Sequence, residues 1–490
     1  MKRGLTIILC AALFCPALVA FIGCTRADPA ARCEYAIDAE YREGILSAEM
    51  DFCYKNQTGV EISQLKFNLF GNAYREDSAY SPVSSVFSAS AYYGGKSYGG
   101  MEILSVSPCA SWEIGGADEN ILVVDLAESV PQGGQAEITV EEGTPVEYRL
   151  TLARVNHRTG IAEHAVNLGN FYPVLCVYEK NRGFYECEYY SDGDPFYSEC
   201  ADYDVTLRVA SDYTAAMSGE ILSAESDGGV TEYRAELINA RDFAIVLSKE
   251  FSLVQGEADG VRVMYYYYDD DRANERLELI ENSLAYFSDT FGEYLYDTYS
   301  AVQTGFCVGG MEYPALTMIG DHISGVDYDY TIVHETAHQW WYAAVGNNQL
   351  ENAWMDEGLA EYSTLLFFDR FKEYGLTRSG LMQSAENAYK AFYSVHSQIF
   401  GQADTAMNKK LGEYLSEYHY VTLTYDKGMI LFDTLRRSVG DKKFFSGLEH
   451  YYAAYSGKVA TPRQLSSSFK KAGVDVSGLF DSFIEGKAVI

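Results

Sequence analysis

The run His334-Glu335-Thr336-Ala337-His338 constrains this chain more than any other feature. On an α-helix, residues at positions i and i+4 lie one above the other on the same face. The imidazoles of His334 and His338 can therefore bind one metal ion, and Glu335 projects beside them, within reach of a water molecule on that ion. Neutral imidazole is a good ligand for Zn²⁺. The run therefore predicts a helix that carries a catalytic zinc site.

A third protein ligand is needed, because catalytic zinc sites usually combine three protein ligands with one open position. Glu357 follows His338 after eighteen intervening residues, which is enough for one helix to end and another to begin. The alternative is a surface helix with two solvated histidines. A His-acid-x-x-His pattern arises by chance in roughly 2% of chains of this composition, and the apolar flanks Ile332-Val333 and Trp340-Trp341 favour a buried helix. We therefore predict a His₂Glu zinc site.

Residues 1–24 are typical of a targeting segment. Lys2-Arg3 gives a positive start, Leu5 to Ile22 is apolar, and Gly23-Cys24 ends the segment. Small residues before a cleavage site indicate a secretory signal, and a small residue directly before Cys24 resembles the bacterial lipoprotein signal, whose cysteine becomes lipidated. We expect an exported protein, lipid-anchored through Cys24 on the outer face of a bacterial cytoplasmic membrane, or otherwise secreted. An ordinary cleaved signal and an uncleaved anchor are the alternatives.

The acid excess limits the partners of the chain. Its formal net charge is −33, and binding to nucleic-acid phosphates needs basic patches. We therefore expect peptides as partners, no nucleic acid, and membrane contact only through the lipid on Cys24.

Cysteine spacing gives no second metal site. No C-x-x-C pair occurs, so a cysteine zinc site is not expected. Cys176, Cys187 and Cys200 lie close enough in sequence for one disulfide among them, and free buried thiols are an equal alternative.

The first half of the chain has the pattern of a β domain, predicted over residues 25–253. Runs such as 146–152 and 203–209 alternate apolar and polar residues with period two, and Gly-Gly pairs separate many such runs. Short strands between turn signals favour an antiparallel sandwich or saddle. His157 and His164 lie in a loop-like stretch, where we expect them to be solvated and not metal ligands.

The second half, residues 254–490, has a different pattern. Residues 261–268 form a strand-like run, and residues 274–291 carry apolar side chains at helical spacing. Helical segments continue after Glu357. The fold class is therefore predicted as α+β with more than one domain, and the metal motif lies in the second.

Four motifs together resemble those of the M1-family (gluzincin) zinc metallo-aminopeptidases. They are His334-Glu335-x-x-His338 with Glu357, Trp354-Met355-Asp356-Glu357-Gly358, Gly309-Gly310-Met311-Glu312, and Tyr425-Asp426-Lys427-Gly428. The similarity covers roughly residues 255–490, and the first half matches only loosely, through Gly169-Asn170-Phe171-Tyr172-Pro173. The resemblance implies a short, lipoprotein-like member with an N-terminal β saddle and a thermolysin-like catalytic domain. It also implies one Zn²⁺ per chain and removal of N-terminal residues from extracellular peptides.

The chemistry of such a site assigns a role to each motif. Glu335 is expected to act as the general base, and Tyr425 to donate a hydrogen bond to the oxyanion, with Tyr420 as the fallback. Gly309, Gly310, Met311 and Glu312 are expected to bind substrate. The glycines would let backbone approach the peptide, and Glu312 would bind its α-ammonium group through charge-assisted hydrogen bonds.

Three departures from the family pattern keep other activities open. Tyr313 stands where the exopeptidase motif usually has Asn, and the first half offers no clear second anchor for the substrate amine. The chain ends at Ile490, without the large helical C-terminal domain of many members, which predicts a more open cleft. An endopeptidase is one alternative, and a non-catalytic peptide-binding surface lipoprotein is another.

Overall fold

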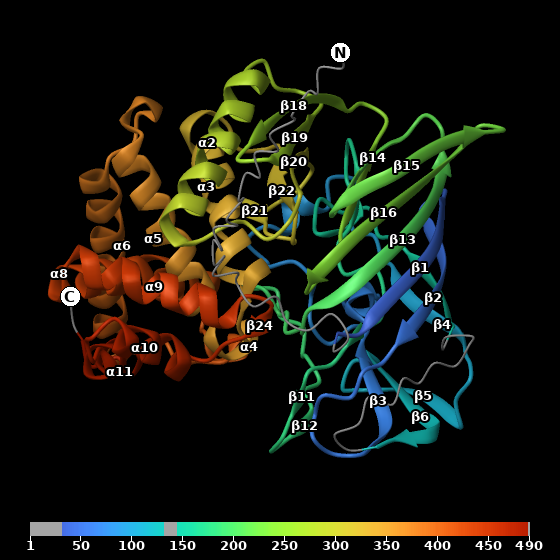
Figure 1. Cartoon of the computed structure of the whole chain (residues 1–490), viewed down its shortest axis with the longest axis horizontal. Coiled ribbons are helices and arrows are strands. Elements are labelled where there is room, and N and C mark those ends of the chain that lie inside the picture. Colours follow the sequence, from blue (N-terminus) through green and yellow to red (C-terminus); the bar gives the residue numbers. More distant parts are fainter. Residues whose placement is uncertain (1–31, 132–144, 489–490) are drawn as a thin grey trace, which may run out of the picture.

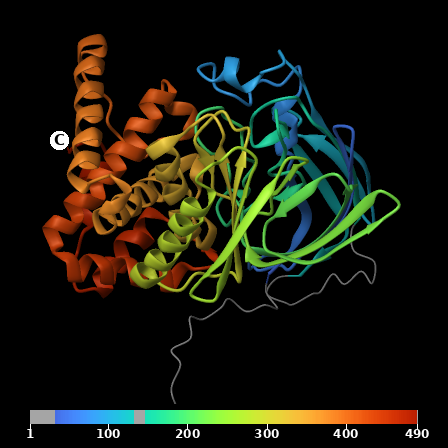
Figure 2. The same ribbon diagram turned by 90° about the horizontal axis from the view of Figure 1, so that it is seen from above.

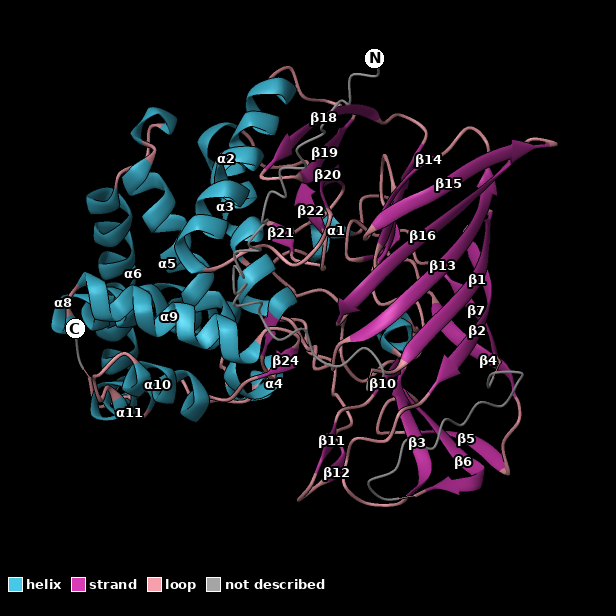
Figure 3. Cartoon of the chain, in the orientation of Figure 1, coloured by secondary structure: helices cyan, strands magenta, loops and turns pink. Residues whose placement is uncertain are grey.

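The computed structural model describes residues 32–131 and 145–488. The targeting segment 1–24, with Cys24, lies outside the described residues. The described chain forms a β-rich half followed by a largely helical half, and the two lie side by side (Figures 1 and 3). Figure 2 shows the same division from above. The predicted α+β class, with a β-rich part before a largely helical part, is confirmed.

A seven-stranded sheet dominates the first half. Residues along its strands alternate between buried and exposed, as in β1, so that one face lies in the core. In order across the sheet, the strands are β15 (Glu220–Asp227), β16 (Val230–Ala240), β13 (Ala201–Ala210), β1 (Glu34–Arg42), β2 (Ile45–Cys53), β7 (Val146–Thr151) and β4 (Gly100–Val106). The strands expected near residues 146–152 and 203–209 are β7 and β13. The pair β1–β13 is parallel, which corrects the expectation of a purely antiparallel domain. No short hairpin joins these two strands, so their direction is free to differ.

Smaller sheets complete this half. One consists of β10 (Val174–Leu175), β3 (Ile62–Asn68), β6 (Ile121–Val130) and β5 (Ser111–Gly115). Another consists of β14 (Thr214–Met217), β17 (Ile245–Ser248), β9 (Val166–Leu168) and β8 (Thr159–Ile161). The short pieces are the hairpin β11 (Tyr178–Glu179) with β12 (Gly183–Phe184), and helix α1 (Ser88–Ala91).

Two residue-level expectations for this half are resolved by the structure. Cys176, Cys187 and Cys200 are free and buried, so the disulfide alternative is wrong. His157 is buried, which corrects its expected solvation, whereas His164 is exposed. The hydroxyl of Tyr74 lies 2.6 Å from His157 Nδ1, and burial holds the pKa of His157 well below its usual range. His157 is therefore a neutral core histidine.

The second half is built on a five-stranded sheet. Its order is β18 (Ser252–Ala258), β19 (Val261–Tyr267), β20 (Thr298–Thr304), β22 (Leu316–Gly320) and β21 (Gly310–Met311). The central strands β19, β20 and β22 are parallel, and the helix α2 (Ala273–Phe291) links the first two. The strand and helix expected near residues 261–268 and 274–291 are thus confirmed.

Helices fill the rest of the second half. They are α3 (Gly325–Ala337), α4 (Gln349–Asn352), α5 (Trp354–Arg370), α6 (Arg378–Phe400), α7 (Glu417–Val421), α8 (Lys427–Val439), α9 (Asp441–Tyr455), α10 (Pro462–Lys471) and α11 (Ser477–Ile484). A short parallel pair, β23 (Val345–Gly346) with β24 (Lys458–Val459), faces the first half. Almost every residue of α5 is buried, so α5 is the central helix. Within the described ranges, no helix has the length and apolar content needed to cross a bilayer.

Buried polar residues join the two halves. The guanidinium of Arg241, on the β-rich side, donates to the carbonyls of Ser198 (2.8 Å), Ala343 (3.3 Å) and Lys458 (3.2 Å), the last two in the helical half. The adjacent Asp242 accepts a 2.6 Å hydrogen bond from the hydroxyl of Tyr342. Buried donors and acceptors that are matched in this way are costly to separate, so they fix the halves against each other.

Candidate metal centre

Three side chains from two helices converge on one point. His334 lies in the last turn of α3, His338 directly follows that helix, and Glu357 lies in the first turn of α5. The two Nε2 atoms are 3.0 Å apart, and each is 3.4 Å from Glu357 Oε2. All three residues are buried, and they form one of the two groups in the described chain that could hold a metal ion.

The two 3.4 Å separations from Glu357 Oε2 fit zinc, and the 3.0 Å separation of the two Nε2 atoms is slightly short for it. Two ligand atoms that each lie about 2.0–2.2 Å from a zinc ion, at tetrahedral angles, are about 3.3–3.6 Å apart. The charge balance also fits. Burial opposes a charge on His334, but Glu357 and Glu361 outweigh it and raise the pKa of His334 to about 10. Burial likewise opposes a charge on Glu357, yet His334 and His338 lower its pKa to about 2. The cluster strongly favours positive charge, which a divalent cation supplies.

The outer nitrogen of each imidazole has its own partner. His334 Nδ1 lies 3.1 Å from Glu361 Oε1, and His338 Nδ1 lies 3.0 Å from the carbonyl of Trp341. Such partners fix the tautomer and the ring orientation of metal-binding histidines. Glu361 is itself held by the Tyr330 hydroxyl at 2.5 Å. Both Nε2 atoms are therefore presented to the shared point.

Glu335 lies beside the ligands in the same cavity, and Oε2 of its carboxylate is buried without a hydrogen-bond partner in the described chain. Burial raises the pKa of Glu335 to about 8, against the lowering effect of His334. The strand β21 passes very close to it. A Cβ at Gly310 would lie 2.5 Å from Glu335 Oε1, so only glycine fits at Gly310.

Two glycines bring the tyrosine motif to the metal ligands. A Cβ at Gly428 in α8 would lie 2.6 Å from the Cα of Gly358 in α5, so the two helices touch backbone to backbone. The π-helical turn 422–426 before α8 then places Tyr425 next to the centre. Its hydroxyl donates a 2.6 Å hydrogen bond to Glu357 Oε1. Tyr420 lines the same cavity, and its buried hydroxyl has no hydrogen-bond partner among the described residues.

Of the four residues expected to bind substrate, Gly310 and Glu312 line the cavity, which has a volume of about 80 Å³. Met311 is buried in the core, and Gly309 is not part of the cavity lining. A Cβ at Gly309 would meet its nearest neighbour, Thr331, at 3.7 Å, which is an ordinary contact. The expected close approach of backbone therefore belongs to Gly310 alone.

Tyr313 points away from the cavity. Its buried hydroxyl donates a 2.9 Å hydrogen bond to Asn170 Oδ1 in the β-rich half. A Cβ at Gly169 would lie 1.9 Å from that hydroxyl oxygen, which explains the glycine before Asn170. Tyr313, which departs from the family motif, therefore contributes to the contact between the two halves.

Sequence reasoning did not find another carboxylate of this cavity, that of Asp194, which comes from the β-rich half. Arg158 holds it through a 2.9 Å ion pair. Burial raises the pKa of Asp194 to about 7, and Glu312 adds to the rise, because the two carboxylates share the cavity. Only the Asp-Gly-Asp turn of residues 192–194 marks this position in sequence, and one such turn among 70 acidic residues carries no signal.

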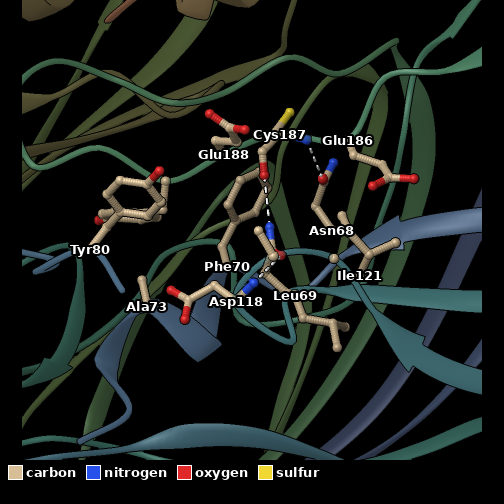
Figure 4. Close-up of a pocket in the computed structure, with 14 residues that line it drawn as sticks. Asn68, Leu69, Phe70, Ala73, Tyr80, Asp118, Ile121, Glu186, Cys187 and Glu188 are labelled. Carbon is tan, nitrogen blue, oxygen red and sulfur yellow. Dashed lines mark hydrogen bonds between the residues drawn. The ribbon is translucent and has the colours of Figure 1, made fainter. Parts of the chain in front are cut away.

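A separate cavity of about 120 Å³ lies within the β-rich half (Figure 4). Polar side chains of this cavity stabilise the surrounding chain through hydrogen bonds. For example, Asn68 Oδ1 accepts a 3.0 Å hydrogen bond from the amide of Cys187. Neither metal-binding group found in the described residues includes a residue of this cavity. Both candidate metal-binding groups therefore lie at the cavity at His334.

Known proteins are similar to this chain in sequence. A sequence model described as the peptidase family M1 domain matches residues 275–483. The human aminopeptidase RNPEPL1 is 29% identical over 201 residues, which is 39% of this chain and 27% of that protein. Aminopeptidase N of Caulobacter vibrioides is 25% identical over 252 residues, which is 48% of this chain and 28% of that protein. The chain thus matches little more than a quarter of the length of these relatives.

Solved structures agree over nearly the whole chain. The M1 zinc metallopeptidase from Deinococcus radiodurans has a TM-score of 0.61 and 14% identity, over 94% of this chain and 95% of that one. A mutant of it, solved with a Tyr-Ser-Ala substrate, has a TM-score of 0.62 and 15% identity, over 94% and 95% of the two chains. At this identity the likeness establishes the fold.

Proposed function

We propose that this chain, which contains a domain of peptidase family M1 over residues 275–483, is a zinc-dependent aminopeptidase. One observation carries the proposal. A cavity next to the three metal-binding side chains also holds the carboxylates of Glu312 and Asp194, which come from different halves. The cavity lining carries six carboxylates and one guanidinium, that of Arg158, which pairs with Asp194. The remaining negative charge attracts cations, and the free α-ammonium group of a peptide is such a cation.

Zinc would be held by His334, His338 and Glu357, and a bound zinc ion supplies Lewis acidity to the scissile carbonyl and to the attacking water. Glu335 is placed to take the proton of that water and to pass it to the leaving amine. Phe306 and Tyr420 form part of the cavity wall around these groups.

Tyr425 would stabilise the negative charge that develops on the carbonyl oxygen. Its hydroxyl donates a 2.6 Å hydrogen bond to Glu357 Oε1, so it already lies next to the metal-binding side chains. Tyr420, with an unpartnered hydroxyl in the same cavity of the described chain, remains the alternative donor. Comparison of Tyr425→Phe with Tyr420→Phe separates the two, because the true donor should lose kcat and the other should not.

The decisive experiment measures fluorophore release from a panel of unblocked aminoacyl amides, with a chelator and with Zn²⁺ restored. We expect chelator-sensitive turnover that Zn²⁺ restores and that Glu335→Gln abolishes while zinc remains bound at one ion per chain. Equal behaviour of wild type and Glu335→Gln would support the peptide-binding alternative. N-acetylated substrates test the amine site, since cleavage at the same rate as free ones would support an endopeptidase.

We further propose export and a lipid anchor. The proposal rests on the positive start, the apolar stretch and the Gly23-Cys24 pair of residues 1–24. Labelling of growing bacterial cells with a radioactive fatty acid should mark the wild-type protein and not Cys24→Ala. Equal label in both, or none in either, would contradict the anchor.

A further inference from the structure

The side-chain amide of Gln349 lies between two buried carboxylates. Its Nε2 donates to Glu312 Oε1 at 3.0 Å and to Asp356 Oδ2 at 2.7 Å. Gln349 begins α4, Glu312 follows β21, and Asp356 lies in the first turn of α5. No more than 3% of any of these three residues is exposed, so water does not compete for the hydrogen bonds.

A second side-chain amide, that of Asn347, holds the carboxylate of Asp356 in place. Asn347 Nδ2 donates to Asp356 Oδ1 at 2.9 Å and to the carbonyl of Asn352 at 3.2 Å. Both oxygens of Asp356 are thereby bound, so its carboxylate cannot turn. The two N–H bonds of Gln349 Nε2 are then directed, one to Asp356 and one to Glu312.

The contact determines how Glu312 can meet a substrate. Gln349 binds Oε1 of Glu312 and leaves Oε2 for another donor. It also separates the Glu312 and Asp356 carboxylates, which belong to one buried group with His338 whose ligand atoms all lie within 4.8 Å of one another. Without the amide, the two carboxylates would face each other directly in a buried site, and Glu312 would move away.

We propose that Gln349 is the positioning residue for the amine-binding site, because it holds the Glu312 carboxylate in the orientation that receives the substrate α-ammonium. This inference rests on the proposed aminopeptidase function. Gln349 touches neither the substrate nor the metal ligands. Its replacement should therefore weaken recognition of the free amine and leave binding at the metal unchanged.

Two hydroxamates that differ only in the α-amino group provide the test. Leucine hydroxamate presents both the ammonium and a metal-binding group, and 4-methylpentanohydroxamate presents only the latter. In calorimetry with the zinc-loaded protein, Gln349→Met should weaken binding of the first compound about tenfold or more and change binding of the second by less than about twofold. KM for free aminoacyl amides should rise by a similar factor, with a smaller change in kcat.

Two more variants separate the positioning role from a general loss of structure. Gln349→Asn keeps an amide that is one methylene group too short to reach both carboxylates, and it should show the same selective loss if Gln349→Met fails to fold. Asn68→Leu removes an equally buried amide that does not line the cavity, and it should change neither affinity. Equal losses for both hydroxamates in the Gln349 variants, or no loss for either, would overturn the proposal.

Glu312→Gln distinguishes a failure of the proposed role of Gln349 from a failure of the proposed amine site. If Glu312→Gln loses the leucine compound selectively and the Gln349 variants do not, the amine site stands and the role of Gln349 is wrong. If wild type binds both hydroxamates equally and Glu312→Gln changes nothing, the amine site itself is wrong, and the inference fails with it.

Discussion

Gly428→Ala adds one methyl group where α8 meets α5, and the structure shows how close this group would come to its neighbours. The new Cβ would lie 2.6 Å from the Cα of Gly358. Two carbon atoms attract best at about 3.5–4.0 Å, so the two helices would have to separate by about 1 Å. The three nearest atoms, which belong to Gly358 and Trp354, are all backbone atoms. The backbone itself must therefore move.

The separation should reduce activity more than stability. Overpacking costs about 1–3 kcal/mol, but alanine in a helix gains about 1 kcal/mol over glycine, so the free energy of unfolding should fall by about 0–2 kcal/mol. The 2.6 Å hydrogen bond from Tyr425 to Glu357 would lengthen to about 3.6 Å, beyond hydrogen-bonding distance. A hydrogen bond to a charged group contributes about 1.5–3 kcal/mol, so losing the bond that Tyr425 is proposed to give to the oxyanion corresponds to a fall in kcat/KM of about 10- to 150-fold.

Urea denaturation and turnover of an unblocked aminoacyl amide measure the two effects on one sample. Gly478→Ala, in α11, is the matched control, because a Cβ at this position would have no neighbour within 4 Å among the described residues. It should raise stability slightly and leave turnover unchanged. Wild-type turnover in Gly428→Ala, together with a gain in stability equal to that of the control, would refute the close-contact reasoning.

Three further substitutions test the junction and the core. Tyr313→Phe should lower the free energy of unfolding by about 1 kcal/mol, because Asn170 loses a donor, and should leave turnover unchanged; a large loss of turnover would place Tyr313 at the substrate. Arg241→Met should cost more than about 3 kcal/mol in urea denaturation, since it leaves several buried carbonyls without donors; a smaller cost would mean that water replaces the guanidinium. Burial lowers the pKa of His419 to about 4, below its ordinary value of 6.5, so between these values the unfolded chain binds more protons and wild type loses stability as the pH falls. His419→Gln should lose less between pH 7 and pH 5, and an equal shift of the urea midpoint would contradict this.

Local spacing made the metal centre predictable from sequence. His334, Glu335 and His338 are fixed by the geometry of one helix, and Glu357 follows at a fixed separation in the next long helix. The glycines at Gly310 and Gly428 could be recognised as parts of motifs, but what each one touches could not. Their partners, Glu335 and Gly358, approach only after the strand and helices have packed.

Residues that depend on distant partners were beyond the reach of sequence reasoning. Asp194 enters the cavity because Arg158, 36 positions earlier, holds its carboxylate. His157 is buried because Tyr74, 83 positions away, supplies a hydroxyl. No period or spacing encodes such pairs. The departure at Tyr313 was interpreted as a change in the substrate site, whereas its partner, Asn170, belongs to the other half.

The two halves of the chain contribute unequally to the proposed reaction. His334, His338 and Glu357 all come from the helical half, so zinc binding does not depend on the junction. The amine site does, because Glu312 comes from the helical half and Asp194 from the β-rich half. Damage at the junction should therefore raise KM for substrates with a free amine before it weakens zinc binding. Since an endopeptidase has no use for such a site, a rise in KM of this kind would favour aminopeptidase action, and an unchanged KM would favour the endopeptidase.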